Sequence, residues 1–241
     1  MKKTKIIIPA LGVLLLSTAA SVTGTVAWFS MNKTVTATGM SVTAKSDSSF
    51  LLIGNEDDDL DTIQGANSIS ATAKNTTDEL YPVAHETIGD TAAATTLSNW
   101  YYMYSDDPDD AMSGATEKLA IASGHFGDYV LQNVFNITVA AGGRAVTNLK
   151  VNTITITPAS GGAQAVNVLV TSASAAQEFT ASDSVATDNT ILSSTVTAQA
   201  VVPIYVFIYW NGNNENVYTN NVDFLKETSV DLTFTYEGLV E

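Results

Sequence analysis

Apolar and polar residues alternate along much of the second half of the chain, and this two-residue period predicts β-strands with one buried face. The alternation runs over residues 128–140, with Asn133 as the one polar interruption on the apolar side, and over 148–157, which is rich in Thr, Ile and Val. It returns over 165–171 and 230–236, and Gly, Pro and Asn separate the segments. Short strands at such spacing predict an all-β fold, a jelly-roll-like β-sandwich.

One predicted strand carries apolar residues on both faces. Within residues 195–210, nearly every position from Val201 to Trp210 is apolar. A strand with this pattern is buried on both sides. We therefore expect it at the centre of a sheet in the sandwich, or covered on both faces.

Residues 54–127 differ from the rest because they hold two acidic runs, many small residues and few periodic stretches. We expect a long, partly helical insertion folded against the sandwich rather than a second domain, with short helices over 96–104 and 109–122. The aromatic run 100–104 needs a surface to pack against, which argues against a disordered linker.

The N-terminus is predicted to be a targeting segment rather than part of the fold. Three lysines precede an almost wholly apolar run over 6–20, and small residues follow. This order is typical of a secretory signal peptide, and we expect residues 1–27 to be removed, with Thr25 at position −3 and Ala27 at −1 of the cleavage site. A retained membrane anchor over 6–27 is the alternative, since that stretch is just long enough to span a bilayer.

Composition narrows the possible partners. The 25 acidic residues outnumber the 10 basic ones, giving a net charge of −15, and cysteine is absent. Binding to nucleic acid needs a basic surface, so no nucleic-acid partner is expected. An anionic membrane surface would repel the chain, so we expect membrane contact only through the signal peptide before cleavage. Thiolate metal sites, thiol nucleophiles and disulfides are excluded.

The segment that follows the predicted cleavage site is predicted to be a strand whose alternation changes phase part of the way along. Within residues 28–38, the apolar residues on one face of the strand are Phe29, Met31, Val35 and Ala37. At Gly39 the phase shifts to the even positions Met40, Val42 and Ala44. A glycine at a phase change suggests a bend, so the two halves could serve different sheets. Residues 28–38 could be the first strand of their own sheet, or a donor strand that completes the sheet of a neighbouring copy. The donor residues would be Trp28, Phe29, Met31, Val35 and Ala37.

Two motifs in this region carry a resemblance. Gly24-Thr25-Val26-Ala27-Trp28-Phe29-Ser30, followed by Gly39-Met40-Ser41-Val42-Thr43-Ala44-Lys45, resembles the start of the TasA/camelysin family of secreted bacterial matrix proteins. The resemblance covers about the first 45 residues. It implies a jelly-roll subunit over 39–241 that is cut by a signal peptidase and assembles into extracellular fibres. It also implies that residues 28–38 are donated to the next subunit.

Camelysin-type relatives are described as metallopeptidases, which makes a zinc motif worth testing. His85-Glu86-Thr87-Ile88-Gly89 begins like H-E-x-x-H, but Gly89 stands where the second histidine ligand is needed. We expect His85 to be a lone exposed histidine. His125, the other histidine, could pair with Asp128 in a turn.

The acidic run 55–61 invites a calcium interpretation, because Asp57, Asp59 and Asp61 alternate. An EF-hand loop starting at Asp57 would need Gly at position 62 and Glu at 68, where Thr and Ser stand. A calcium site of another kind stays open, but a solvated turn is the simpler interpretation. We expect no cofactor, no metal site, no catalytic residues and no enzymatic activity.

The sequence thus favours a secreted structural subunit in an extracellular biofilm matrix or at the cell surface, with copies of itself as its partners. The alternative is a monomeric surface adhesin or carbohydrate-binding module with aromatic rings as stacking platforms. The rings considered are Trp100, Tyr101, Tyr102, Tyr104 and Trp210.

Overall fold

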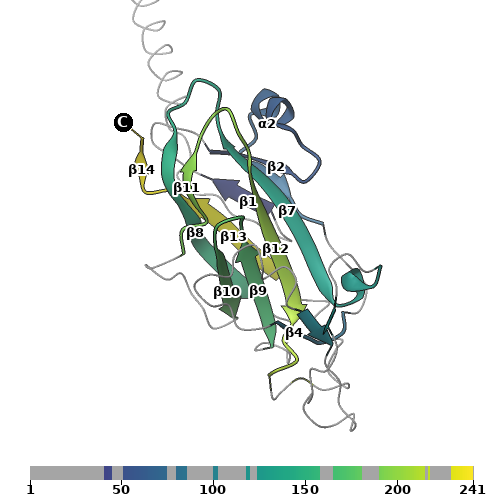
Figure 1. Ribbon diagram of the computed structural model, residues 1–241. Coiled ribbons are helices and arrows are strands. Elements are labelled where there is room, and N and C mark those ends of the chain that lie inside the picture. Colours follow the sequence, from purple (N-terminus) through teal and green to yellow (C-terminus); the bar gives the residue numbers. More distant parts are fainter. Residues whose placement is uncertain are drawn as a thin grey trace, which may run out of the picture. The chain divides into compact units, whose positions relative to one another are not determined.

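The computed structural model describes residues 41–44, 51–74, 80–85, 100–102, 118–119, 124–157, 165–180, 190–214, 217 and 229–240. The chain divides into two units, Met1–Lys33 and Thr34–Glu241, and all described residues belong to the second. Strands dominate these residues, and the prediction of an all-β sandwich is confirmed (Figure 1). In the described part of the chain, no helix is long and apolar enough to cross a membrane.

The first sheet has the strand order β11-β8-β13-β1-β3, and the short strand β14 pairs with β8 beside β13. Its pairings are antiparallel except that β1 runs parallel to β13. The strands are β1 (Ser41–Ala44), β3 (Ser70–Thr72), β8 (Val146–Thr157), β11 (Ser193–Val196), β13 (Ser229–Thr235) and β14 (Gly238–Leu239).

The second sheet is wholly antiparallel and has the order β10-β9-β12-β7-β2. Its strands are β2 (Leu51–Asn55), β7 (Val130–Val139), β9 (Val166–Thr171), β10 (Ala176–Thr180) and β12 (Val202–Trp210). Along the chain, β7, β9, β10 and β12 belong to this sheet, and β8, β11 and β13 belong to the first. The chain therefore passes repeatedly from one sheet to the other.

The main core lies between the two sheets and contains the apolar residues predicted from alternation. Strands of the first sheet contribute Val151, Ile154 and Leu232, and strands of the second contribute Phe135 and Val168. All of these are buried. The predicted segments agree with β7, β8, β9 and β13 to within two residues at each end, because one buried face fixes the register of a strand.

Strand β12 confirms the prediction drawn from its two apolar faces. It lies between β7 and β9, and Ile204 and Val206 point into the main core. On the other face, Phe207 and Tyr209 belong to a second apolar cluster with Trp100. Both sides of the strand are thus covered.

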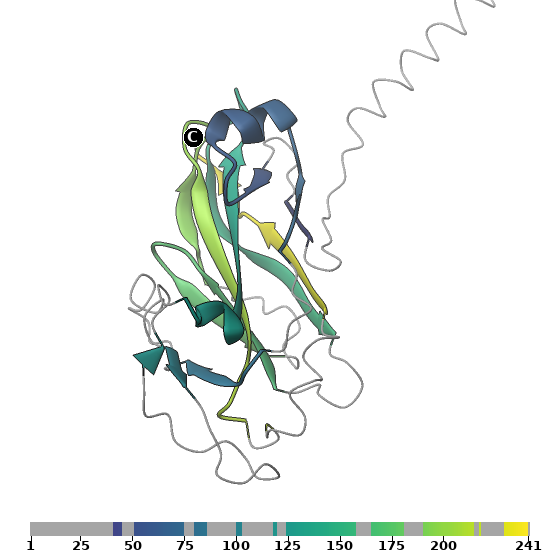
Figure 2. The ribbon, with the colours of Figure 1, turned by 90° about the vertical axis from the view of Figure 1, so that its right-hand side faces the viewer.

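The second face of β12 is covered by a three-stranded sheet, here called the cover sheet, which comes from the predicted insertion (Figure 2). It consists of β4 (Val83–His85), β5 (Trp100–Tyr102) and β6 (Lys118–Leu119). Trp100 is fully buried, with its ring centroid 4.8 Å from that of Tyr209 and 5.6 Å from that of Phe207. The backbone N–H of Gly212, just after β12, donates to the carbonyl of Val83 and ties β4 to the second sheet.

The expected helix over 96–104 is wrong at residues 100–102, which form strand β5. Cross-strand pairing with β4 and β6, together with burial of Trp100, outweighs the weak local preference of this segment. The helix described within the insertion is α2 (Leu60–Ala66), and a one-turn 3₁₀ helix, η2 (Phe126–Asp128), precedes β7. The expected helix over 109–122 is wrong at residues 118–119, which form β6 because they pair with β5, and residues 109–117 and 120–122 lie outside the described residues.

The Trp100 ring makes a direct test of the cover sheet possible. Trp100→Ala should lower the free energy of unfolding by about 3–5 kcal/mol, because a buried aromatic side chain leaves a cavity against Phe207 and Tyr209. Tyr81→Ala, at a residue 55% exposed, should cost only about 0.5–1.5 kcal/mol, because it removes a ring contact with Tyr129 but leaves no buried cavity. Chemical denaturation measures both, and equal effects would contradict the proposed role of Trp100.

Candidate functional site

The predicted donor residues and the predicted cleavage site lie outside the described residues. Trp28, Phe29, Met31, Val35 and Ala37 all precede Ser41, where the first described strand begins, and so do Thr25 and Ala27. The second half of the predicted N-terminal strand is described. It forms β1 within the first sheet, two residues after the phase change at Gly39.

Strand β1 brings the beginning of the described chain next to its C-terminal part, because it pairs with β13. Val42 lies opposite Leu232 and Ala44 opposite Phe234, so the even positions of β1 align with core positions of β13. The pairing covers three of the seven residues of β13. Since the strands are parallel, the chain enters β1 at the end of β13 that carries Ser229.

The sandwich is closed at one side by main-chain contacts. Strand β2 ends the second sheet, and the N–H of Ile53 donates to the carbonyl of Ser68 at 3.0 Å, just before β3, which ends the first sheet. The opposite ends of the two sheets are β10 and β11. No described strand pairs with the outer side of either.

The acidic run 55–61 forms a turn and a helix cap. Asp58 Oδ2 accepts from the N–H of Asn55 at 2.7 Å, and Asp59 Oδ1 accepts from the N–H of Thr62 at 2.8 Å, which caps α2. Hydrogen bonds from Thr62, first from its side chain and then from its backbone, hold the pKa of Asp59 below its ordinary value.

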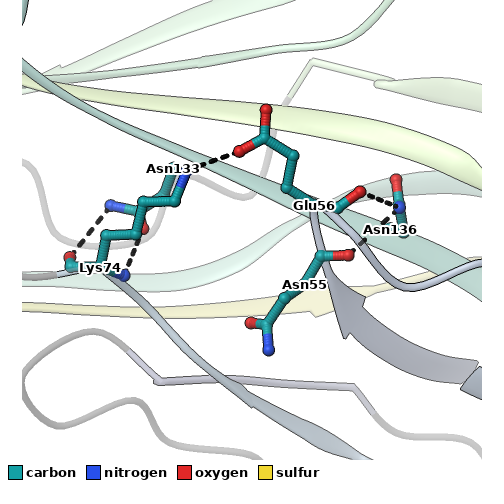
Figure 3. A network of polar contacts seen from close by, with 5 residues as sticks. All are labelled: Asn55, Glu56, Lys74, Asn133 and Asn136. Carbon is teal, nitrogen blue, oxygen red and sulfur yellow. Dashed lines mark hydrogen bonds and ion pairs between the residues drawn. The ribbon is translucent and has the colours of Figure 1, made fainter.

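The carbonyl oxygens of the same turn are held by one buried amide. Asn136 on β7 donates from Nδ2 to the carbonyls of Asn55 at 3.2 Å and Glu56 at 3.3 Å (Figure 3). It also donates to the carbonyl of Asp58 at 3.0 Å. A calcium site needs several free oxygens around one point. Here the turn carbonyls already accept hydrogen bonds, and the described residues contain no group of three or more His, Asp or Glu side chains able to hold a metal ion.

Asn133, the polar interruption noted on β7, has a structural role. Its side chain is buried, accepts from the N–H of Lys74 at 2.6 Å and donates to the carbonyl of Lys74 at 3.4 Å (Figure 3). The amide thus pairs with Lys74 in the way a neighbouring strand would. The Lys74 ammonium reaches Glu56 at 2.5 Å in an exposed ion pair, which contributes little to stability.

The two histidines have different environments. The expectation that His85 is exposed is wrong: the residue is 8% exposed, and its ring centroid lies 4.5 Å from that of Trp100. The two residues are direct cross-strand partners, so burial of Trp100 buries His85 with it. Residues 86–89 lie outside the described residues. His125 lies in an exposed turn, and the pairing with Asp128 that was considered for it is present, with Nδ1 and Oδ2 3.1 Å apart.

The aromatic residues considered as stacking platforms are largely core residues. Trp100 and Trp210 are fully buried, so neither can stack on a sugar from solvent. Tyr101 and Tyr102 are half-buried, and Tyr104 lies outside the described residues. The structure removes the two tryptophans from the carbohydrate-binding hypothesis.

Sequence reasoning missed a group of three neighbouring tyrosines, here called the tyrosine cluster: Tyr81, Tyr102 and Tyr129. The ring centroid of Tyr129 lies 5.6 Å from that of Tyr81 and 5.0 Å from that of Tyr102. Burial raises the pKa of the Tyr129 phenol, and Tyr102, Asp128 and Tyr81 add to the shift. No sequence signal could have found the cluster, because its members are brought together by β-pairing between distant segments.

Three polar residues that contact one another lie on the face of the second sheet that points away from the main core. The Tyr209 hydroxyl donates to Glu178 Oε1, which also accepts from Asn167 Nδ2 at 2.9 Å. The three residues come from β12, β10 and β9, so the contact ties the outermost strand to the centre of the sheet. The buried phenol at the edge of the second cluster is thereby satisfied.

Asp231 on β13 faces away from the main core, beside Thr155 of β8. Its Oδ1 is buried and has no hydrogen-bond partner among the described residues. This burial raises the pKa of the Asp231 carboxyl, because a desolvated carboxylate is disfavoured relative to the neutral acid.

Comparison of the chain with protein-family models, with characterised proteins and with solved structures finds no match.

Asn136 provides a test of the turn. Asn136→Ala should lower the free energy of unfolding by about 1–3 kcal/mol, since three carbonyls lose their donor. Asn136→Asp should be at least as destabilising, because it directs a carboxylate at the same oxygens. Thr155→Ala, at an exposed position of β8, serves as the control in the same urea titration. Unchanged stability of the Asp variant would contradict the donor role of Asn136.

Asp231 makes stability depend on pH. Because the pKa of Asp231 is raised in the folded state, the folded chain binds the proton of this carboxyl more tightly than the unfolded chain does. The contribution of the protonated carboxyl to stability is fully present below the unfolded pKa of about 3.9, and it is lost as pH rises through the folded pKa. Asp231→Asn should therefore be more stable than the parent at pH 7. The gain should vanish near pH 3, as measured by urea unfolding at both values. A variant less stable at pH 7 would show that the carboxylate is favourably paired.

Proposed function

We propose that the chain is a secreted structural subunit that polymerises into extracellular fibres by donor-strand complementation. In this proposal residues 28–38 of one subunit, freed by signal-peptide cleavage after Ala27, add a strand to the sandwich of the next. The fibres belong to an extracellular matrix or to the cell surface, and the partner of each subunit is another copy of the chain.

The observation that carries the proposal is the position of β1. The first described strand begins at Ser41, after the phase change at Gly39, and it already belongs to the chain's own sheet. An apolar, alternating segment of eleven residues, 28–38, precedes it. Cleavage after Ala27 would place this segment at a terminus, where an apolar strand is an aggregation hazard unless a partner buries it.

The connectivity of the sandwich supports the jelly-roll detail. The two strand orders contain β1-β13-β8-β11 in one sheet and β7-β12-β9-β10 in the other. A jelly roll with two four-stranded layers is expected to have this order, with the first strand beside the last. The departure from that pattern is the parallel direction of β1, which would be antiparallel to its neighbour in a regular jelly roll.

That departure suggests where the donated strand binds. On the side of β13 that faces β1, residues Ser229–Asp231 have no pairing partner among the described strands. This stretch contains the apolar residue Val230, and the donor residues Phe29, Met31, Val35 and Ala37 have the two-residue spacing of a strand that could pair beside it. Main-chain hydrogen bonds would provide affinity and the alternate side chains would fix register.

Electron microscopy and sedimentation of the chain starting at Trp28 test the proposal. Phe29→Asp combined with Val35→Asp places two charges on the apolar face of the donor segment and should abolish fibres. Ser30→Asp combined with Thr36→Asp adds the same charge to the opposite face and should leave fibres intact. A chain lacking residues 28–38 should stay monomeric.

Two outcomes would overturn the proposal. Fibres of the same form from the chain lacking residues 28–38 would show that another surface drives assembly. A parent chain that stays monomeric at high concentration over varied salt and pH would remove the fibre function. Circular dichroism of each variant checks that the sandwich is still folded.

A further inference from the structure

The tyrosine cluster combines residues from three separate segments. Tyr81 precedes β4, Tyr102 ends β5, and Tyr129 links η2 to β7. Centroid separations of 5.0 and 5.6 Å place Tyr129 in direct ring contact with both of the others. The backbone supports the pair formed by Tyr81 and Tyr129, since the N–H of Tyr81 donates to the carbonyl of Asp128 at 2.9 Å.

Exposure divides the cluster into an outer and an inner part. Tyr81 is 55% exposed, whereas Tyr102 and Tyr129 are half-buried against the second apolar cluster. A soluble oxidant can therefore reach the Tyr81 ring, and Tyr129 is the tyrosine next to it. The planes of these two rings are tilted by 46°, and their centroids lie 5.6 Å apart.

We propose that Tyr81 and Tyr129 form an oxidative cross-linking site that yields an intramolecular dityrosine. The oxidant is hydrogen peroxide acting through a haem peroxidase. Each phenol loses one hydrogen atom, and the two radicals join through the ring carbons ortho to the oxygens. The two ring hydrogens then return to the oxygens as the rings regain aromaticity. One C–C bond replaces two C–H bonds, and the peroxide takes up two electrons and two protons to give two molecules of water.

The inner ring needs no direct access to the oxidant. A radical formed at Tyr81 can take a hydrogen atom from the adjoining Tyr129 phenol, which restores Tyr81 and moves the radical inward. A second oxidation at Tyr81 then places both radicals side by side. The Tyr129 phenol carries its proton at neutral pH, because burial raises its pKa above the ordinary value, so its O–H has a hydrogen atom to give.

Such a bond would act on a part of the fold whose strands are short. It closes the segment 82–128, which contains the cover sheet with strands of only three, three and two residues. Since the chain has no cysteine, a disulfide cannot do this. A covalent link across a long loop stabilises by restricting the unfolded chain. The proposal does not depend on fibre formation.

The test is peroxide with horseradish peroxidase on the monomeric chain, followed by fluorescence, intact mass and peptide mapping. The expected product is a monomer lighter by two hydrogen atoms, with dityrosine fluorescence and a linked pair of peptides containing Tyr81 and Tyr129. Its melting temperature should rise by roughly 5–15 °C.

Single Tyr→Phe variants keep the ring and thus the fold. Tyr81→Phe and Tyr129→Phe should each lose the product, whereas Tyr205→Phe should retain it, because the ring next to Tyr205 is Phe207. Tyr102→Phe should also retain it.

Three results would overturn the assignment. One is product formation in Tyr81→Phe at the level of the parent chain. Another is a link found only between chains, seen as covalent dimers in denaturing gels. The last is absence of dityrosine under conditions that couple free tyrosine in the same mixture.

Discussion

The fold depends on the burial of β12 from both sides. An antiparallel strand whose two faces are apolar cannot lie at the surface of a single sheet, so it needs a layer on each face. One layer is the first sheet, which packs against Ile204 and Val206. The other is the cover sheet, which packs against Phe207 and Tyr209 through Trp100. The cover sheet, which comes from the part of the predicted insertion between β3 and β7, therefore contributes to the core of the fold.

Buried amides support this arrangement at the points where strands end. Asn133 and Asn136 lie on the same strand, β7. The Asn133 side chain satisfies the backbone of Lys74, which follows β3, and the Asn136 side chain satisfies carbonyls of the turn that follows β2. A leucine at either position would bury more apolar surface but would leave those backbone groups without partners. The two asparagines on β7 are thus needed because backbone groups of the neighbouring segments depend on their side chains for hydrogen bonds.

The sequence predicted strands most successfully where the burial of a residue follows from the pattern of apolar and polar positions in its own strand. The alternation over β7, β8, β9 and β13, and the two apolar faces of β12, follow from local patterns. It failed where a partner far along the chain decides the outcome. Residues 100–102 are a strand because β4 and β6 flank them, and His85 is buried because Trp100 lies opposite. The parallel pairing of β1 with β13 and the contact of Tyr81 with Tyr129 likewise join residues that no sequence spacing relates.

The parallel pairing of β1 with β13 has a mechanical consequence. Tension applied at the N-terminal side of Ser41 and at the C-terminal side of Thr235 pulls the two strands along their length in opposite directions. In this geometry the hydrogen bonds between the strands share the force and must break together, whereas strands pulled apart from one end release their bonds one by one. Direction of pairing, rather than the number of hydrogen bonds, would then set the resistance of the first sheet to stretching.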